Sequence, residues 1–475
     1  MSALVFSGCA FDPSGIRGKE QNGGGADASV DSDAITSEEG GVFPDAYVPD
    51  GFVPDGYVPD AYVPDAYVPL CDPDDCPLGC NAILDRCNRL NPSNFDSEGF
   101  YDSLTGGIAS AAGETITVYT DSGEINGASQ YRAQGNPGAV QNGIYWNIVS
   151  QTAGHEIAVF GFTNLVLAEN SRIDIVGRHP AAFYVIGNVT LGQNSRINAT
   201  ASARHPGAGG GRGGVNNGAD GDTCGNNSHG KGGDMAGSGT DQLEAGGGGG
   251  GNRGSGGDGG DARYAGVFAP GGAGGHPGNT INLVPLAGGC GGGAGGGPDT
   301  AGNNWAGGDG GYGGGGGGAV QISAGGTIVI SVGAGVNVAG AGGQGGLYGA
   351  GGGGGGAGGS ILLEAAIIQN EGLLAANGGG GGAGGGSTVQ AAAQNGQNGG
   401  FDEGRAGGGI GVNWGGNGGA GGGGSFIDGQ DAPDDANAGG GGGGGGRVRM
   451  NYLSTVQPGN SSPHNPSVHE GLNFW

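Results

Sequence analysis

Short apolar runs recur along the chain beyond residue 100 and form four equivalent units of three strands each. The runs are rich in β-branched and aromatic residues and are too short for helices, which is typical of strands. The predicted first strands are 157–160, 183–186, 320–323 and 361–364, the second are 165–167, 189–191, 327–330 and 366–368, and the third are 173–175, 197–199, 336–338 and 373–375. A further run at 447–452 predicts the strand that ends the stack.

The turn between the second and third strands carries the clearest local signal. It begins with Asn170, Asn194, Gly333 or Asn370 in the four units. Asn and Gly adopt a positive φ most readily, so their interchange at one position predicts a left-handed corner. A repeated unit of two strands, a corner and a third strand predicts the coils of a parallel β-helix, or solenoid.

The links between units differ greatly in length. Residues 176–182 join the first unit to the second, whereas residues 200–319 separate the second from the third and residues 339–359 the third from the fourth. Insertions that fall repeatedly at one point of a repeat lie on one face of a solenoid. The sequence therefore predicts a mainly β fold, a β-solenoid with long glycine-rich insertions.

Glycine runs such as 313–318, 351–356 and 439–446 fill these insertions. One interpretation is a flexible linker. The other is a set of extended polyglycine II helices, whose missing side chains let neighbouring chains share backbone hydrogen bonds, because every N–H and C=O needs a partner. Both interpretations are compatible with the sequence.

Glycine supplies 129 of the 475 residues, and 43 acidic residues against 16 basic ones give a net charge of −27. This balance argues against a nucleic-acid partner, because phosphate contacts need clustered Lys and Arg. No apolar run approaches the ~20 residues of a membrane-spanning helix. We therefore expect contact with a membrane only through a lipid anchor.

The seven Cys fall into three groups. The cluster Cys71, Cys76, Cys80 and Cys87 predicts two local disulfides in a small knot at 71–90, with the connectivity left open, and Cys224 and Cys290 predict a long-range disulfide. The alternative for this cluster is a zinc site, but the spacing of the four Cys residues lacks the Cys-x2-Cys pairs that zinc sites usually contain. Disulfides indicate an oxidising compartment.

The first nine residues resemble the end of a bacterial lipoprotein signal. The residues Leu4 to Gly8 precede Cys9 as they would precede a lipidated cysteine, although the basic start and most of the apolar stretch of a signal peptide are missing. Either the start codon is placed too late, which we favour, or the match is due to chance and the segment is a short disordered leader with an exposed thiol. Cys9 is also the Cys that the disulfide count leaves over, so we expect lipidation at Cys9.

Residues 10–70 predict a disordered acidic spacer. They contain few aliphatic residues, and five pentapeptides of the type Val-Pro-Asp-Ala-Tyr repeat at 43–67. Pro in every repeat forbids a helix, and each Pro pushes the preceding residue to extended geometry. Such a segment would hold the glycine-rich region, residues 91–475, away from a membrane.

Two motifs could bind a metal ion, but the sequence around each of them argues against it. Residues 256–263 match the calcium nonapeptide of β-roll proteins once, with Arg263 where an apolar residue belongs. Arg-His-Pro occurs at His179 and again at His205, at the same point of neighbouring units. Stacked His side chains would allow metal binding, but Pro after each His favours a turn.

No constellation of catalytic residues recurs in the units. Asp174 in the first unit is matched by Asn198, Asn337 and Leu374 in the others, so no pair of carboxylates is repeated. We therefore predict no catalytic residue, no metal site and no cofactor. The alternative is a polysaccharide lyase or hydrolase on a β-helix.

The strand units, the glycine content and the Cys-rich segment 71–80 ahead of Asn91-Pro92-Ser93-Asn94 resemble the glycine-rich secreted lipoproteins of myxobacteria and their relatives, which are PE-PGRS-like low-complexity proteins. The resemblance covers most of residues 71–450. It implies an exported protein at the cell surface or outer membrane. We expect a non-catalytic structural or adhesive lipoprotein whose partners are polysaccharides or other cell-surface components.

Overall fold

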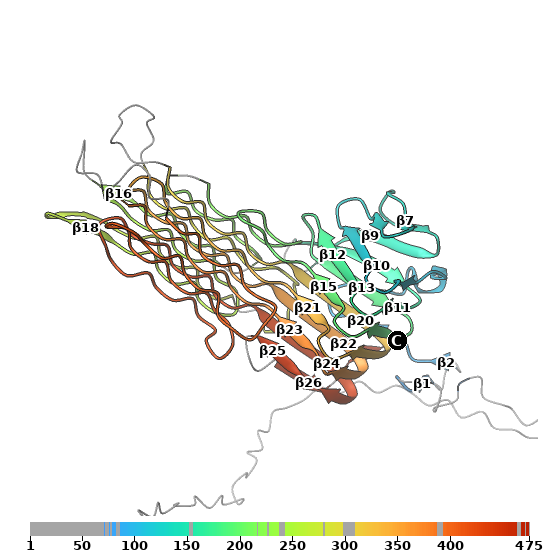
Figure 1. Ribbon diagram of the computed structural model, residues 1–475. Helices are drawn as coiled ribbons and strands as arrows, with labels where there is room; N and C mark the ends of the chain where they lie inside the picture. Colours follow the sequence, from blue (N-terminus) through green and yellow to red (C-terminus); the bar gives the residue numbers. More distant parts are fainter. Residues whose placement is uncertain are drawn as a thin grey trace, which may run out of the picture. The chain divides into compact units, whose positions relative to one another are not determined.

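In the computed structural model (Figure 1), the chain divides into two units, residues 1–67 and residues 68–475. The structure describes residues 71, 76, 78–81, 86–151, 155–215, 217–225, 228–236, 243–278, 281–297, 309–386, 393–462, 467–470 and 472–474. The predicted lipidation site Cys9 and the spacer at 10–70 lie outside the described residues.

The described residues are mainly β, without α-helix, and two large sheets dominate them. The larger sheet has the order β26-β24-β22-β20-β13-β10-β9-β8, with β4, β11 and β14 paired beside this path. Its strands are β4 (Ile108–Ala109), β8 (Ala139–Gln141), β9 (Ile144–Ser150), β10 (Glu156–Phe162), β11 (Leu165–Leu167), β13 (Ala181–Val185), β14 (Val189–Leu191), β20 (Ala319–Ile330), β22 (Ser360–Asn370), β24 (Arg447–Gln457) and β26 (Ser467–Glu470).

The second sheet has the order β25-β23-β21-β15-β12-β5-β6-β7. Its strands are β5 (Thr115–Tyr119), β6 (Ile125–Asn126), β7 (Gln130–Arg132), β12 (Arg172–Val176), β15 (Arg196–Asn198), β21 (Gly335–Asn337), β23 (Leu373–Ala375) and β25 (Asn460–Ser462). The remaining elements are β1 (Cys80–Asn81), β2 (Arg86–Cys87), β3 (Leu90–Asn91), a 3-10 helix at Tyr101–Ser103, β16 (Met235–Ala236), β17 (Leu243–Glu244), β18 (Ala262–Tyr264), β19 (Val267–Ala269) and β27 (Asn473–Phe474).

The four predicted units pair with one another in parallel. The third strands are in register through Ile173, Ile197, Val336 and Leu374. The first strands are displaced from the expected alignment, because Phe183 pairs with Phe160 rather than with Ile157. Strands β4 and β5 precede the predicted units and pair in parallel with β11 and β12, while β24 and β25 follow them.

Both faces of the larger sheet are buried. Phe160 and Phe183 lie in the core enclosed by the two sheets, whereas Val159 and Tyr184 belong to a second core on the opposite face. Segment 90–104 contributes Leu90, Phe95, Phe100 and Leu104 to that second core. Apolar area removed from water stabilises a fold by about 25 cal/mol per Å². Because these strands are buried on both faces, successive residues are apolar instead of alternating with polar ones.

The corners between second and third strands differ among the units. The φ angle is 57° at Asn170, 58° at Asn194 and 74° at Gly333. Asn370 does not have the expected positive φ. The register places Asn370 level with Ile330, at the end of β22, so its corner contains only residues 371–372, whereas the preceding one contains residues 331–334. Its Oδ1 accepts a hydrogen bond from the backbone N–H of Gly372 at 3.0 Å.

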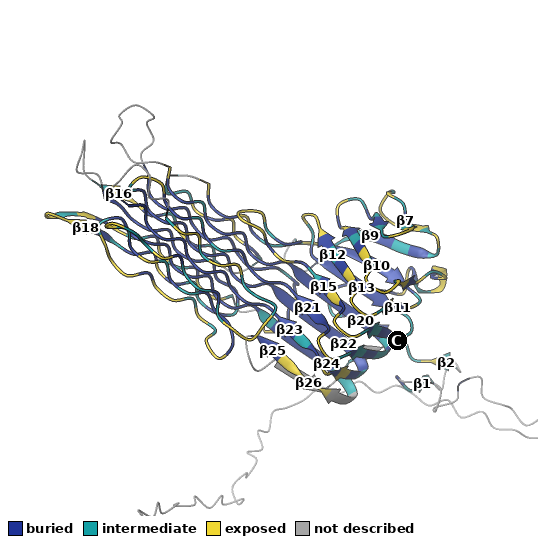
Figure 2. Ribbon diagram, viewed as in Figure 1, coloured by how far each residue is buried: buried dark blue, intermediate teal, exposed yellow. Residues whose placement is uncertain are grey.

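The three glycine-rich insertions leave after β15, β21 and β23 and return at β20, β22 and β24. Figure 2 shows them as extended, largely buried segments that run side by side. In the run 246–251, successive backbone N–H groups donate to three neighbouring segments in turn. Every third residue therefore donates to the same segment. The pairs are Gly246 to Gly260, Gly247 to Gly352, Gly248 to Lys231, Gly249 to Gly257, Gly250 to Gly355 and Gly251 to Ser228.

Close packing explains why these runs are glycine. A Cβ added to Gly246 would come within 3.0 Å of the Gly439 carbonyl oxygen, and one added to Gly249 would do the same at Gly442. Real Cβ atoms essentially never approach other atoms so closely. The flexible-linker interpretation is therefore wrong for the described runs, whose amides are bonded and whose residues are buried.

Three disulfides close the described Cys residues into pairs. Cys71 bonds Cys80, and Cys76 bonds Cys87, which settles the connectivity within the cluster. Cys224 bonds Cys290 as expected, and joins two parts of the first insertion.

Candidate functional site

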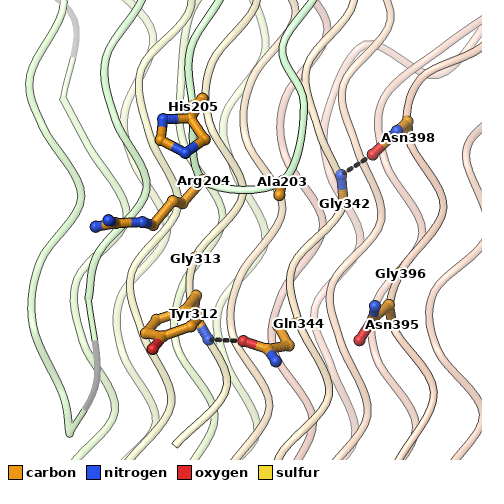
Figure 3. A pocket seen from close by; sticks show the side chains of 10 residues that line it. All are labelled: Ala203, Arg204, His205, Tyr312, Gly313, Gly342, Gln344, Asn395, Gly396 and Asn398. Atoms are coloured by element: carbon orange, nitrogen blue, oxygen red, sulfur yellow. Dashed lines mark hydrogen bonds between the residues drawn. The ribbon is translucent and has the colours of Figure 1, made fainter.

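A groove of about 500 Å³ lies on the glycine tracts rather than on the sheets. Figure 3 shows Arg204 and Tyr312 on one side and Asn395 and Asn398 on the other, with Gln344 between them. Its lining consists of Ala203, Arg204, His205, Tyr312, Gly313, Gly342, Gln344, Asn395, Gly396 and Asn398.

Backbone hydrogen bonds fix the order of the tracts that form the groove floor. Gly315 donates to the Ala203 carbonyl, Ala341 donates to the Gly315 carbonyl, and Gly399 donates to the Gly340 carbonyl. Four segments from all three insertions are thus held side by side. The groove therefore has a floor of interbonded backbone rather than of free loops.

A tight turn presents the cationic side of the groove. Ser202 and His205 exchange backbone hydrogen bonds of 2.9 Å, and Ala203 takes a φ of 51° between them. This geometry makes His205 part of a turn, as the following Pro predicted. The Arg204 guanidinium lies over the ring of Tyr312, 5.9 Å from its centroid.

The amide side chains of the groove have a structural role. Each uses its oxygen to accept a backbone N–H from the neighbouring tract: Gln344 from Tyr312 at 3.4 Å, Asn395 from Gly345 at 2.9 Å and Asn398 from Gly342 at 2.9 Å. Within the described part of the chain, the three amide nitrogens have no hydrogen-bond partner. They are therefore donors that a ligand can use.

The groove lining offers an aromatic ring, a guanidinium and amide groups. A ring, a guanidinium and amide donors can contact a ligand rich in hydroxyl groups. The described lining has no Asp or Glu, whereas glycoside hydrolysis ordinarily needs two carboxyl groups beside the scissile bond.

A smaller pocket of about 230 Å³ contains the other Arg-His-Pro motif. His179 lies between two carboxylates, with Nε2 3.6 Å from Asp121 and Nδ1 3.7 Å from Glu156. It lines a different pocket from His205, so the two His side chains that the repeat suggested as a stacked pair do not share a site.

The carboxylates singled out in the sequence have structural partners. Asp174 accepts a hydrogen bond of 3.0 Å from Asn198, and the register continues through Asn337 to Ala375, not to Leu374 as expected. In the sequence 256–263, Asp258 and Asp261 each accept a backbone N–H from the adjacent segment, Gly274 and Gly271 respectively.

One carboxylate that sequence reasoning missed is buried within the second core. Glu364 is 2% exposed and accepts hydrogen bonds of 2.8 Å from Gln321 and Ser323 and of 3.1 Å from Asn451. Ser93 also donates to it. Glu364 therefore ties segment 90–104 to three neighbouring strands.

The Cys cluster has the composition of a metal site but not its chemistry. The sulfurs of Cys71, Cys76 and Cys87 lie within 4.8 Å of one another. All three take part in disulfides, and zinc binds thiolates. The sulfurs are therefore unsuited to the zinc site weighed as the alternative.

The groove residues Tyr312, Gln344, Asn395 and Asn398 were not recognised in the sequence. Tyr312 and Gln344 each stand alone among glycines, whereas Asn395 and Asn398 follow Gln394 and Gln397. Only the lateral order of the tracts brings the four residues together. For Tyr312 and Gln344, a useful signal would have been that a large residue interrupts an otherwise uniform glycine run.

The described residues include no helix with the length and apolar character needed to cross a membrane. Comparisons with protein-family models, with curated proteins and with solved structures returned no match.

Proposed function

We propose that this chain is a non-catalytic cell-surface lipoprotein that binds polysaccharide through the groove of its glycine tracts. The observation that carries the proposal is the juxtaposition of Tyr312, Arg204 and three amide side chains on a hydrogen-bonded backbone floor. A rigid floor supports binding, since less conformational entropy is lost when the ligand arrives.

The architecture behind this function is proposed to be a β-solenoid that carries a bundle of polyglycine II helices. Parallel, successive pairing of the units supports the solenoid. The rotation of hydrogen-bond partners at every third residue of the run 246–251 supports helices with three residues per turn.

Surface location is part of the same proposal. Three disulfides in the described residues support an oxidising compartment. Lipidation at Cys9 and the spacer at 10–70 would then hold the groove away from the membrane. Mass spectrometry of the protein from its native host would show a lipid on Cys9 if this part is right, and an unmodified residue would contradict it.

Binding of the full chain to a panel of neutral and charged polysaccharides tests the function. We expect Tyr312→Ala and Arg204→Ala each to weaken binding about tenfold, because buried contacts of aromatic and Arg side chains dominate interfaces. Tyr119→Ala is the matched control, since Tyr119 is an exposed tyrosine, 37% accessible, on β5 and outside the groove.

Two outcomes would contradict the proposal. One is equal binding by the wild-type protein and both groove variants. The other is the release of reducing or unsaturated ends from a bound polysaccharide, which would assign the chain to the glycan-active enzymes instead.

A further inference from the structure

Arginine side chains in this protein repeatedly cover aromatic rings. Among the described residues, six pairs have the guanidinium carbon between 3.9 and 5.9 Å from a ring centroid. They are Arg89 on Tyr101, Arg132 on Trp146, Arg196 on Phe401, Arg204 on Tyr312, Arg263 on Phe268 and Arg405 on Phe426. The chain has only 16 basic residues, so this use of them is a prominent feature.

One exposed aromatic pair among the described residues has no such cover. Tyr264 and Trp414 are 53% and 63% exposed, and their rings meet edge to face with centroids 6.1 Å apart. Tyr264 ends β18, which Figure 1 shows at the far end of the glycine tracts from the sheets. Both rings keep a face available, since an edge-to-face contact covers only part of each.

The backbone holds this pair in place from two sides. Tyr264 ends the first strand of a tight hairpin, in which Ala262, Arg263 and Tyr264 pair with β19. Trp414 sits in a turn with a φ of 78°, an unusual conformation for a bulky residue. Its carbonyl accepts the N–H of Asn437 at 3.2 Å. An exposed Trp in an unfavourable backbone conformation is typical of functional positions.

An acidic residue, Asp435, lies next to the aromatic pair along the backbone. Asp435 is exposed and pairs through its backbone with Ala262 and Arg263, next to Tyr264. On its other side, a Cβ added to Gly416 would be 3.1 Å from the Asp435 Cβ, two residues after Trp414. None of the ion pairs found among the described residues involves Asp435.

We propose that Tyr264, Trp414 and Asp435 form a docking site for an arginine-bearing segment of a partner protein. An incoming guanidinium would stack on the Trp and Tyr rings and pair with the carboxylate, as the chain's own arginines do elsewhere. The net charge of −27 favours a cationic partner and would accelerate its encounter with the protein.

Fluorescence anisotropy with a labelled nona-arginine peptide tests this site on the full chain. We expect Trp414→Ala and Tyr264→Ala each to weaken binding about fivefold at high salt, where non-specific attraction is screened. Trp414→Phe should restore most of the affinity. Phe426→Ala is the matched control, because Phe426 is 61% exposed but already covered by Arg405, and it should bind like the wild type.

The same measurements separate this site from the polysaccharide groove. Tyr312→Ala should leave the affinity for the peptide unchanged, whatever it does to polysaccharide binding. Equal affinity of the wild type, Trp414→Ala and Tyr264→Ala for the peptide would overturn the proposal. So would cosedimentation with phosphatidylcholine vesicles that depends on Trp414, because the rings would then serve a choline headgroup. Thermal melting checks that each variant is folded.

Discussion

Glycine is required at individual positions of this protein by distance rather than by flexibility. The glycines of the runs lie so close to neighbouring carbonyl groups that a methyl group has no room, as Gly249 and Gly442 illustrate. Asn, Asp and Gln side chains then accept the N–H groups at the margins, as Asn398 does from Gly342. Glycine normally destabilises regular secondary structure, but here only glycine allows the neighbouring chains to pack this closely.

Substitution of Gly249 by Ala should destabilise the protein by about 1–3 kcal/mol, because overpacking forces the neighbouring chain to move. Gly99→Ala provides the control, since nothing lies within 4 Å of a Cβ at that position. Chemical denaturation of both variants measures the difference. Equal stability of the two variants would show that the tracts are not packed as described.

Glu244 should make the stability of the protein depend on pH. Burial raises its pKa from 4.5 to about 8, and its Oε1 has no hydrogen-bond partner in the described structure. The folded protein therefore keeps a proton that the unfolded chain releases, so the free energy of unfolding decreases as the pH rises from about 4.5 to 8.

Thermal melting across that pH range checks the role of Glu244. The variant Glu244→Gln cannot ionise, so we expect its melting temperature to exceed that of the wild type by a margin that grows between pH 5 and pH 8. Parallel curves for the two proteins would rule out a raised pKa at this residue.

At the scale of elements, the sequence contains the order of the strands but not their register. Strand β13 is buried along its whole length, so its residues do not alternate between apolar and polar, and alternation is what specifies register. This explains why Phe183 was aligned with Ile157 instead of Phe160. The corners were easier to locate, because a positive φ restricts the residue type.

The corner at Asn194 offers a test of that restriction. Replacement by Val should cost about 1–2 kcal/mol, because a β-branched residue opposes the left-handed conformation, whereas Asn194→Gly should change stability by less than about 1 kcal/mol. Thr190→Val, on the neighbouring strand β14, is the control in extended backbone. Similar losses for the Val and Gly variants at position 194 would contradict a conformational cause.

For the molecule as a whole, the glycine insertions and the strands form one compact unit. Sequence reasoning placed the insertions at one point of the repeat, yet it could not order them. A run of identical glycines carries no information about which chain lies beside it, and so the groove around Tyr312 and Asn395 was not foreseen. The structure also shows that hydrogen bonds between tracts, rather than apolar side chains, hold much of this unit together.

Removal of the Cys224–Cys290 disulfide should destabilise the glycine tracts. The bond spans a separation of 66 residues, and restricting a loop of that length in the unfolded chain stabilises a fold by about 4 kcal/mol. We expect the double variant Cys224→Ser/Cys290→Ser to unfold at correspondingly lower denaturant concentration. A shift close to zero would mean that the tracts need no covalent closure.

Amide hydrogen exchange, resolved along residues 246–251, 351–358 and 439–446, tests the central claim most directly. If these runs are a hydrogen-bonded bundle, their amides should exchange as slowly as those of strands β20 and β22. Exchange at the rate of an unstructured chain, beside protected strands, would show that the tracts are loose segments and that no groove exists on them.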